Sequence, residues 1–169
     1  VPGQRDRTLL ALDQLLAGTS YAAYARVATT GPSGRGAADG HNLVTLSRFP
    51  IREHRQVLHG LVDPLRRQSI TAVPRPAEAE PVRFDRPLLV TDIELPNGES
   101  LTVVNLHLRA PLASSVPGQK LEPFVWKTVG GWAEGYFLSA MRRAGQALEL
   151  RLLLDQSFDD QAHALIVVA

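Results

Sequence analysis

Residues 88–108 read LLVTDIELPNGESLTVVNLHL, and the fold is best predicted by working outward from this stretch. Two runs, Leu88–Leu95 and Leu101–Leu108, are rich in aliphatic and β-branched residues and suit β-strands. Between them stands Pro96-Asn97-Gly98-Glu99, and Asn-Gly is the strongest short-range signal for a β-hairpin. The stretch therefore predicts two antiparallel strands joined by a tight turn.

Upstream of the hairpin, the pattern predicts one helix and three further strands. They are expected over Thr8–Leu16, Tyr21–Val27, Asn42–Ser47 and Arg55–Leu58. The helix is amphipathic, because Leu9, Leu12 and Leu16 recur at helical spacing. The strand at 55–58 is expected to return beside the strand at 42–47. The proline-rich segment Pro64–Glu80 is interpreted as a surface excursion.

Downstream, Ala110–Thr128 predicts a long ordered loop, and a helix is expected from about Trp132 to Phe158. Its core-facing residues are expected to be Phe137, Met141, Ala144, Leu148 and Leu152. Its solvent face is expected to carry Arg142, Arg143, Glu149 and Arg151. A final apolar run, residues 164–169, predicts a buried strand. This mixture of hairpins and helices favours sheets covered by helices.

Composition indicates an ordinary globular chain. It has 169 residues, 44% apolar and 21% charged, with a formal net charge of +1. A net charge this close to zero does not indicate a nucleic-acid binder. It does not exclude one either, because a local basic patch would not be visible in the total charge. Without cysteine there is no disulfide, and the compartment stays undetermined. No apolar run approaches the length that spans a membrane.

The two ends of the sequence carry a prediction of their own. The chain starts at Val1 rather than Met and stops at Ala169 within an apolar run. Because termini usually lie at the surface, we expect the native sequence to continue beyond Ala169. The alternative is a strand that ends at the edge of the molecule.

Three segments together resemble the endonuclease/exonuclease/phosphatase superfamily. They are Gly40–Ile51 (GHNLVTLSRFPI), Leu101–Leu108 (LTVVNLHL), and Arg143–Leu148 (RAGQAL) with the closing run LIVVA at 165–169. Their order and spacing are similar to the family over roughly Thr8–Ala169. The resemblance implies an α+β fold, a deoxyribonuclease-like four-layer α/β/β/α sandwich that is incomplete in this chain. It implies a single domain over 1–169, truncated at both termini.

The resemblance also implies a metal-dependent phosphoesterase. Phosphoester hydrolysis needs charge stabilisation and a nucleophilic water, and Mg²⁺ or Mn²⁺ supplies both through oxygen ligands. In the family these ligands are an early Asn and Glu, the Asp and Asn of a Gly-Asp-Phe-Asn turn, and a late Asp-His pair. They are expected before Val1 and after Ala169. This chain alone is therefore expected to lack the metal ligands and to be inactive.

Three residues are candidates for contact with a phosphate ester. His107 corresponds to the family histidine at the scissile phosphate, a task that suits a side chain able to donate a hydrogen bond or proton near neutral pH. The alternative interpretation is that His107 is a core or sheet histidine whose ring forms a hydrogen bond with a neighbouring group. Asn42 is either a phosphate ligand or a turn asparagine. Arg109 either meets a phosphate or is an exposed arginine at a strand end.

Other polar and aromatic residues are given structural interpretations. Gln146 is expected to be buried and hydrogen-bonded to a loop. The remaining histidines lack metal-ligand spacing and are interpreted as surface residues; they are His41, His54, His59 and His163. Pro123–Lys127 with Trp132 could stack on a base or cover a lipid headgroup. A loop packed by its own aromatic side chains is the preferred interpretation.

The function predicted from the resemblance is hydrolysis of a phosphodiester or phosphomonoester, with His107 at the scissile phosphate. The substrate is expected to be nucleic acid, a phosphoinositide or a small phosphodiester. The alternative is a non-catalytic binding domain that retains the sandwich. Unpaired sheet edges also predict self-association of this chain.

Overall fold

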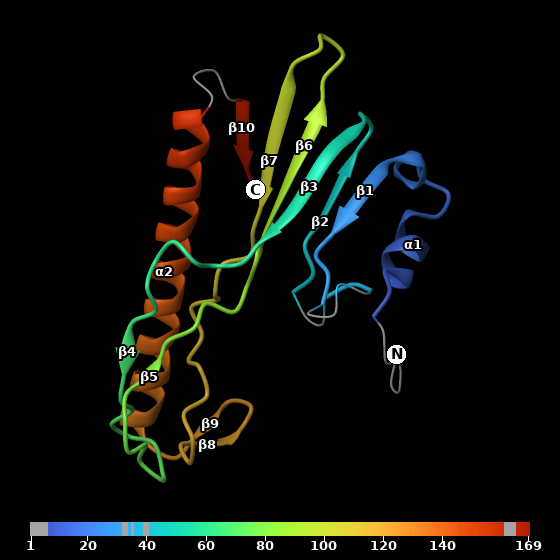
Figure 1. Ribbon diagram of the computed structural model, residues 1–169. Coiled ribbons are helices and arrows are strands. Elements are labelled where there is room, and N and C mark those ends of the chain that lie inside the picture. The colour runs from blue at the N-terminus through green and yellow to red at the C-terminus, as the bar shows by residue number, and fades with distance from the viewer. Residues whose placement is uncertain (1–6, 32–33, 35, 39–40, 161–164) are drawn as a thin grey trace. The chain divides into compact units, whose positions relative to one another are not determined.

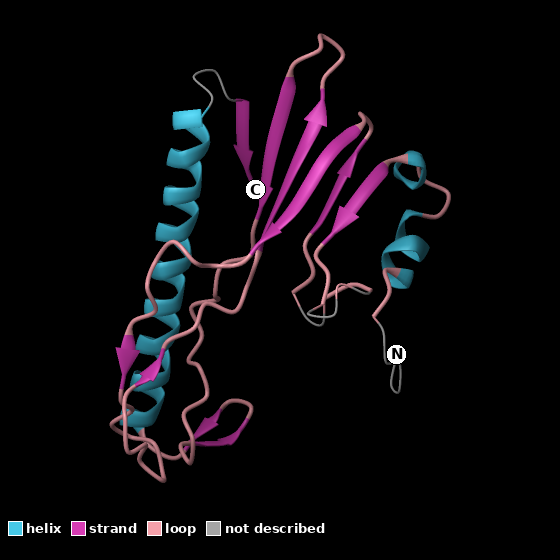
Figure 2. Cartoon of the chain, viewed as in Figure 1, coloured by secondary structure: helices cyan, strands magenta, loops and turns pink. Residues whose placement is uncertain are grey.

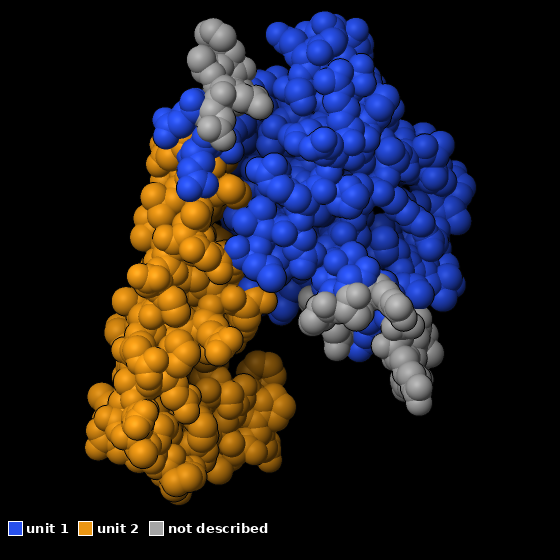
Figure 3. Space-filling model, viewed as in Figure 1, with its two compact units in different colours: residues 1–58, 86–107, 156–169 blue, residues 59–85, 108–155 orange. Residues whose placement is uncertain are grey.

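The computed structural model describes residues 7–31, 34, 36–38, 41–160 and 165–169, which form an α+β chain (Figure 1). The chain divides into two compact units (Figure 3). Unit 1 comprises Val1–Leu58, Arg86–His107 and Gln156–Ala169. Unit 2 comprises His59–Asp85 and Leu108–Asp155. The single-domain organisation over 1–169 stays a prediction.

The predicted hairpin is confirmed as β6 (Leu88–Glu94) and β7 (Ser100–Asn105), which pair antiparallel. In the turn, Gly98 has φ +85° and its N–H donates to the Leu95 carbonyl at 2.9 Å. Glycine adopts this left-handed conformation without the cost that a Cβ imposes. The local Asn-Gly signal therefore determines the register of the hairpin.

β7 is shorter than expected, because it ends at Asn105 rather than at Leu108. The register that pairs Leu89 with Asn105 would place Pro87 opposite His107. Proline has no N–H to donate, so the ladder cannot extend to this pair. His107 consequently lies in the segment that follows the strand.

The main sheet of unit 1 has the order β10-β7-β6-β3 (Figure 2). Its outer strands are β3 (Ile51–Val57), antiparallel to β6, and β10 (Leu165–Val168), parallel to β7. The central strand β6 is the most buried, with Leu89 and Thr91 fully buried. A central position explains why this strand lacks an exposed polar face.

The second sheet of unit 1 pairs β1 (Ala25–Ala28) with β2 (Val44–Ser47). The expectation that the strand at 55–58 returns beside β2 was wrong, because β3 pairs with β6. The turn after β2 redirects the chain: Phe49 N–H donates to Ser47 Oγ at 3.0 Å. The Pro50 carbonyl then accepts from Glu94 N–H at 2.9 Å, which draws β3 into the β6 sheet.

The N-terminal part of unit 1 differs from the prediction in one element. The helix is confirmed as α1 (Leu10–Leu16), and Leu9, Leu12 and Leu16 form its half-buried stripe. The expected strand Tyr21–Val27 begins only at Ala25, because a 3-10 turn, η1 (Ser20–Ala23), occupies its first half. Tyr24 N–H donates to the Tyr21 carbonyl at 3.1 Å, so a local bond replaces strand pairing there.

Unit 2 contains most of the long helix α2 (Val129–Asp160), whose residues from Gln156 belong to unit 1. Two short antiparallel pairs accompany the helix: β4 (Arg66–Arg67) with β5 (Glu80–Pro81), and β8 (Lys120–Glu122) with β9 (Val125–Trp126). The segment Ala110–Thr128, expected to be a loop, thus contains a small hairpin. None of the described helices is long and apolar enough to cross a membrane.

The buried face of α2 is not the one that its apolar periodicity predicts. Phe137 is 51% exposed and Leu148 49% exposed, whereas Glu134, Gln146 and Glu149 are each 6% exposed or less. The expectation that Glu149 faces solvent was therefore wrong.

The reason lies in the loops of unit 2, whose backbone N–H groups need acceptors once buried. Glu149 accepts from Leu61 N–H and Val62 N–H, the latter at 2.7 Å. Glu134 accepts from the N–H groups of Ile70 and Thr71 at 2.9 and 2.8 Å. The face of α2 that carries these two carboxylates is therefore buried, although the spacing of apolar residues predicts that a different face is buried.

Candidate functional site

Unit 1 brings three basic side chains together beyond the end of β7. The rings of His107 and His41 meet edge to face, with centroids 4.9 Å apart. Arg86 Nη2 lies 3.1 Å from His41 Nε2, and Arg86 Nη1 donates to the His107 carbonyl at 3.3 Å. We call His41, Arg86 and His107 the basic cluster.

Each member reaches the cluster from a different part of the sequence. Arg86 stands two residues before β6, and His107 stands two residues after β7, so the hairpin register brings them to the same end of the sheet. His41 comes from the loop before β2. It has φ +50°, a conformation that costs a non-glycine residue about 1–3 kcal/mol. Such a backbone persists only where its surroundings hold it.

The loop that carries His41 is fastened by Thr29, which is fully buried. The Thr29 hydroxyl donates to Asn42 Oδ1 at 3.2 Å and accepts from Leu43 N–H at 3.0 Å. Asn42 is thus adjacent to the cluster and holds its loop, which agrees with the turn interpretation. Direct contact of Asn42 with a phosphate stays a prediction.

The electrostatics of the cluster favour an anion. Arg86 is a permanent cation that is only 8% exposed, so its field is less screened than that of a surface arginine. His107 is an exposed residue, yet partial desolvation by its neighbours lowers its pKa, and the positive charges of Arg86 and His41 lower it further. His107 is therefore neutral at neutral pH, with one ring nitrogen able to donate and the other to accept.

A second link concerns Asn105, which precedes His107 in the family-like segment. Asn105 Nδ2 donates to the Val44 carbonyl at 3.1 Å and so ties β7 to β2. This bond joins the two sheets of unit 1 near the segments that carry His107 and His41. Asn105 is therefore a positioning residue for the cluster.

The described residues do not fit the expected divalent cation. Mg²⁺ and Mn²⁺ prefer carboxylate and other oxygen ligands, whereas the cluster consists of a guanidinium and two imidazoles. No three His, Cys, Asp or Glu side chains gather as a metal-binding group in the part of the chain that the structure describes.

Arg109 belongs to unit 2 and is held there. Its guanidinium lies 3.4 Å from Asp85 Oδ2 and donates to Ser114 Oγ at 3.3 Å. Its backbone N–H donates to Gln146 Oε1 at 2.8 Å, and Gln146 is 1% exposed. The predicted buried role of Gln146 is thus confirmed, whereas phosphate binding by Arg109 stays a prediction.

Sequence reasoning missed Arg86 and His41. Arg86 showed no signal, because a charged residue before a proline and a strand usually lies at the surface. His41 was interpreted as a surface histidine, and it is exposed, but its ring packs on His107. Its proximity to Asn42 in the family-like segment was the available clue. Gly40 of that segment and His163 lie outside the described residues.

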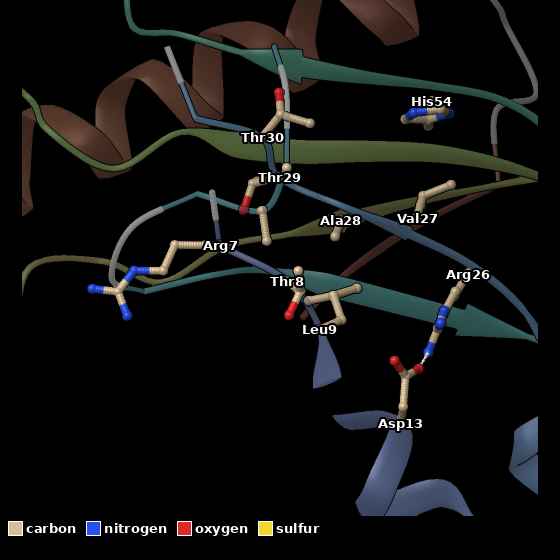
Figure 4. Close-up of a pocket in the computed structure, with 12 residues that line it drawn as sticks. Arg7, Thr8, Leu9, Asp13, Arg26, Val27, Ala28, Thr29, Thr30 and His54 are labelled. Carbon is tan, nitrogen blue, oxygen red and sulfur yellow. Dashed lines mark hydrogen bonds and ion pairs between the residues drawn. The ribbon is translucent and has the colours of Figure 1, made fainter. Parts of the chain in front are cut away.

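A separate cavity of about 490 Å³ lies beside β1 and α1 in unit 1 (Figure 4). Arg26 from β1 and Asp13 from α1 form an ion pair in its wall. Val27, Ala28 and Leu9 add apolar surface, and Arg7 points away from the ion pair (Figure 4).

Comparison with protein-family models, with curated proteins and with solved structures found no match to this chain. The family resemblance therefore stays a hypothesis that depends on the three segments.

Proposed function

We propose that this chain binds a phosphate ester at the basic cluster and belongs to a phosphoesterase of the endonuclease/exonuclease/phosphatase type. The observation that carries the proposal is the buried guanidinium of Arg86 beside two imidazoles, one of which is the histidine of the family-like segment. The four-layer sandwich and the Mg²⁺ or Mn²⁺ requirement of that family are part of the same proposal.

The cluster suits the charge changes of phosphoester hydrolysis. A phosphodiester carries one negative charge, which Arg86 neutralises, and guanidinium hydrogen bonds to phosphate oxygens are strong and directional. His41 donates a further hydrogen bond. Neutral His107 can donate its N–H to a phosphoryl oxygen, and once protonated it can give a proton to the leaving oxygen.

Binding is tested with dimethyl phosphate, a diester without an aromatic ring. We expect its addition to shift the side-chain NMR signals of His107 and His41 in the wild-type chain. The variant His107→Leu, whose side chain cannot donate a hydrogen bond, should bind at least fivefold more weakly, about 1 kcal/mol for one hydrogen bond. The matched control is His54→Leu, at an exposed histidine on β3. Equal binding by both variants would refute the proposed site.

Hydrolysis is tested separately with bis(4-nitrophenyl) phosphate in the presence of Mg²⁺ or Mn²⁺. Release of 4-nitrophenol that His107→Leu abolishes and His54→Leu leaves intact would support the esterase. Because no carboxylate group suited to a metal gathers among the described residues, a non-catalytic binding domain is the second candidate. Hydrolysis would decide for the esterase, whereas binding without hydrolysis is expected of this chain under either function, because the chain alone is expected to lack the metal ligands.

We also propose that the chain self-associates through one edge of the main sheet. Of the two outer strands, β3 carries the exposed charged residues Arg52, Glu53 and Arg55, which protect an edge from pairing. β10 instead exposes Leu165, Val167 and Val168, each between 45% and 49%. The apolar β10 edge is therefore the surface expected to pair with a second copy.

A further inference from the structure

Unit 2 contains a cavity whose wall is aromatic and basic. Its volume is about 370 Å³, within the range of small-molecule sites. The side chains that matter here are Arg109, Leu112, Lys120, Phe124, Trp126 and Trp132. They come from the segment after β7, from the β8–β9 hairpin and from the start of α2.

Two of the three aromatic side chains of this cavity are exposed, whereas Trp126 is half-buried. Phe124, between β8 and β9, is 90% exposed, and Trp132 on α2 is 47% exposed. The preferred interpretation of these aromatics as packing residues was therefore wrong for Phe124. Exposed aromatic surface is costly in water, so its concentration around one cavity points to a ligand that covers it.

The hairpin that presents these groups is anchored at its base. Gln119 is 5% exposed and donates to the Thr71 carbonyl at 2.5 Å. Its Oε1 accepts from the Thr128 hydroxyl at 2.7 Å, and its carbonyl accepts from Lys127 N–H at 2.7 Å. The wall of the cavity is thus fixed before any ligand arrives, which lowers the entropy cost of binding.

Two cations lie among the aromatic groups. Lys120 Nζ lies 5.7 Å from the centroid of the Trp126 ring, and the two residues face each other across the hairpin. Arg109 is oriented by Asp85 and Ser114. A flat ring can stack on the tryptophan or phenylalanine faces, while a negative group beside it meets Lys120 or Arg109.

We propose that this cavity is a binding site for a planar aromatic ring that carries a negative charge. The site lies within unit 2 and does not depend on the phosphoesterase proposal. The negative group is either a carboxylate or a phosphate, and the probes below distinguish these two sources.

Tryptophan fluorescence measures the proposal directly, because the chain has two tryptophans and both line this cavity. The probes are 2-naphthoate, adenosine 5′-monophosphate, neutral 2-naphthalenemethanol and inorganic phosphate. We expect saturable quenching by at least one aromatic anion, with affinity at least fivefold above that of the neutral ring. Inorganic phosphate should cause no change. Quenching by naphthoate alone assigns a carboxylate ligand, and quenching by the nucleotide alone assigns a phosphate ligand.

Two variants separate the contributions of charge and ring. Lys120→Gln should weaken the aromatic anion about three- to fivefold and leave the neutral ring unchanged, as expected for a partly exposed charge pair. Phe124→Ala should weaken both ligands. Leu15→Ala, a 73% exposed leucine on α1, is the matched control and should change neither. Non-saturable quenching by every probe, or identical affinities for charged and neutral rings, would overturn the proposal. His107→Leu should not affect this titration, so the two sites can fail independently.

Discussion

At the residue scale, the proposed anion site depends on the buried Arg86, whose positive charge also lowers the pKa of the neighbouring His107. Partial desolvation and the charges of Arg86 and His41 lower the pKa of His107. A bound anion reverses the charge contribution, because a negative group favours the imidazolium. The state of His107 therefore reports whether the cluster is occupied.

We predict that dimethyl phosphate raises the pKa of His107. The ligand-bound pKa then exceeds that of the free protein, so linkage requires affinity to increase as pH falls from the ligand-bound pKa to the free-protein pKa, which is lowered from its ordinary value. The diester keeps one charge over this range, so the change belongs to the protein. NMR titration of the imidazole with and without ligand checks it, and an unchanged His107 pKa would exclude contact with the anion.

Replacing the arginine should act on the same histidine. In Arg86→Gln the positive neighbour is lost, so the pKa of His107 should rise towards its ordinary value, while dimethyl phosphate binds about tenfold more weakly. Arg52→Gln, which removes an exposed cation paired with Glu94 on β6, is the control. Circular dichroism verifies folding of both variants. If Arg86→Gln does not fold, Arg86→Lys tests binding instead. Lysine keeps the positive charge but lacks the paired N–H donors with which a guanidinium binds two phosphate oxygens.

At the element scale, α2 is a helix whose buried acceptors organise the loops of unit 2. Burial by itself raises the pKa of Glu134, but hydrogen bonds from Thr71, Arg67 and the Ile70 backbone outweigh it and lower the pKa to about 2. The carboxylate thus stays ionised inside unit 2.

The packing of α2 also requires a glycine at position 145, because the Phe84 ring occupies the space that a side chain would fill there.

Glu134→Gln should reduce the free energy of unfolding at pH 7 by about 3 kcal/mol, because it leaves Arg67 without its buried partner. Since the folded pKa of Glu134 is depressed, its stabilisation is present above pH 4.5 and is lost as pH falls towards 2. The difference between wild type and variant should therefore shrink over that window. Urea unfolding at pH 7 and pH 3 measures it, with Glu122→Gln as the exposed control.

Two leucines of α2 test which face is buried. Leu153 is 9% exposed and Leu148 is 49% exposed. Leu153→Ala should cost about 2–3 kcal/mol of unfolding free energy, and Leu148→Ala less than about 1 kcal/mol. An equal loss of unfolding free energy in the two variants would contradict the assignment of Leu153 to the buried face and Leu148 to the exposed face.

At the scale of the whole molecule, the prediction concerns the two outer strands of the main sheet. We expect concentration-dependent dimers in light scattering, formed through the apolar β10 edge. Val167→Lys should shift the chain to monomer, since a charge on an edge strand opposes pairing. His54→Lys on β3 is the matched control and should leave the dimer unchanged. A wild-type monomer at all concentrations would contradict self-association.

The sequence by itself determined the elements whose signals are local. The β6–β7 hairpin follows from Asn97-Gly98, and α2 follows from a long run of helix-forming residues. The burial of Gln146 was also predicted correctly, whereas the strand expected to contain His107 ends at Asn105.

Only the tertiary structure decided which groups meet. Hydrophobic periodicity could not show that loop N–H groups would select Glu134 and Glu149 for the inner face of α2, because those donors lie about 60–90 residues away in the sequence. Likewise, Pro87 stops the β7 ladder only because the hairpin register places it opposite His107. The basic cluster joins residues 41, 86 and 107, and no local pattern relates them. Their proximity follows from the pairing of strands, which brings distant segments to one end of a sheet.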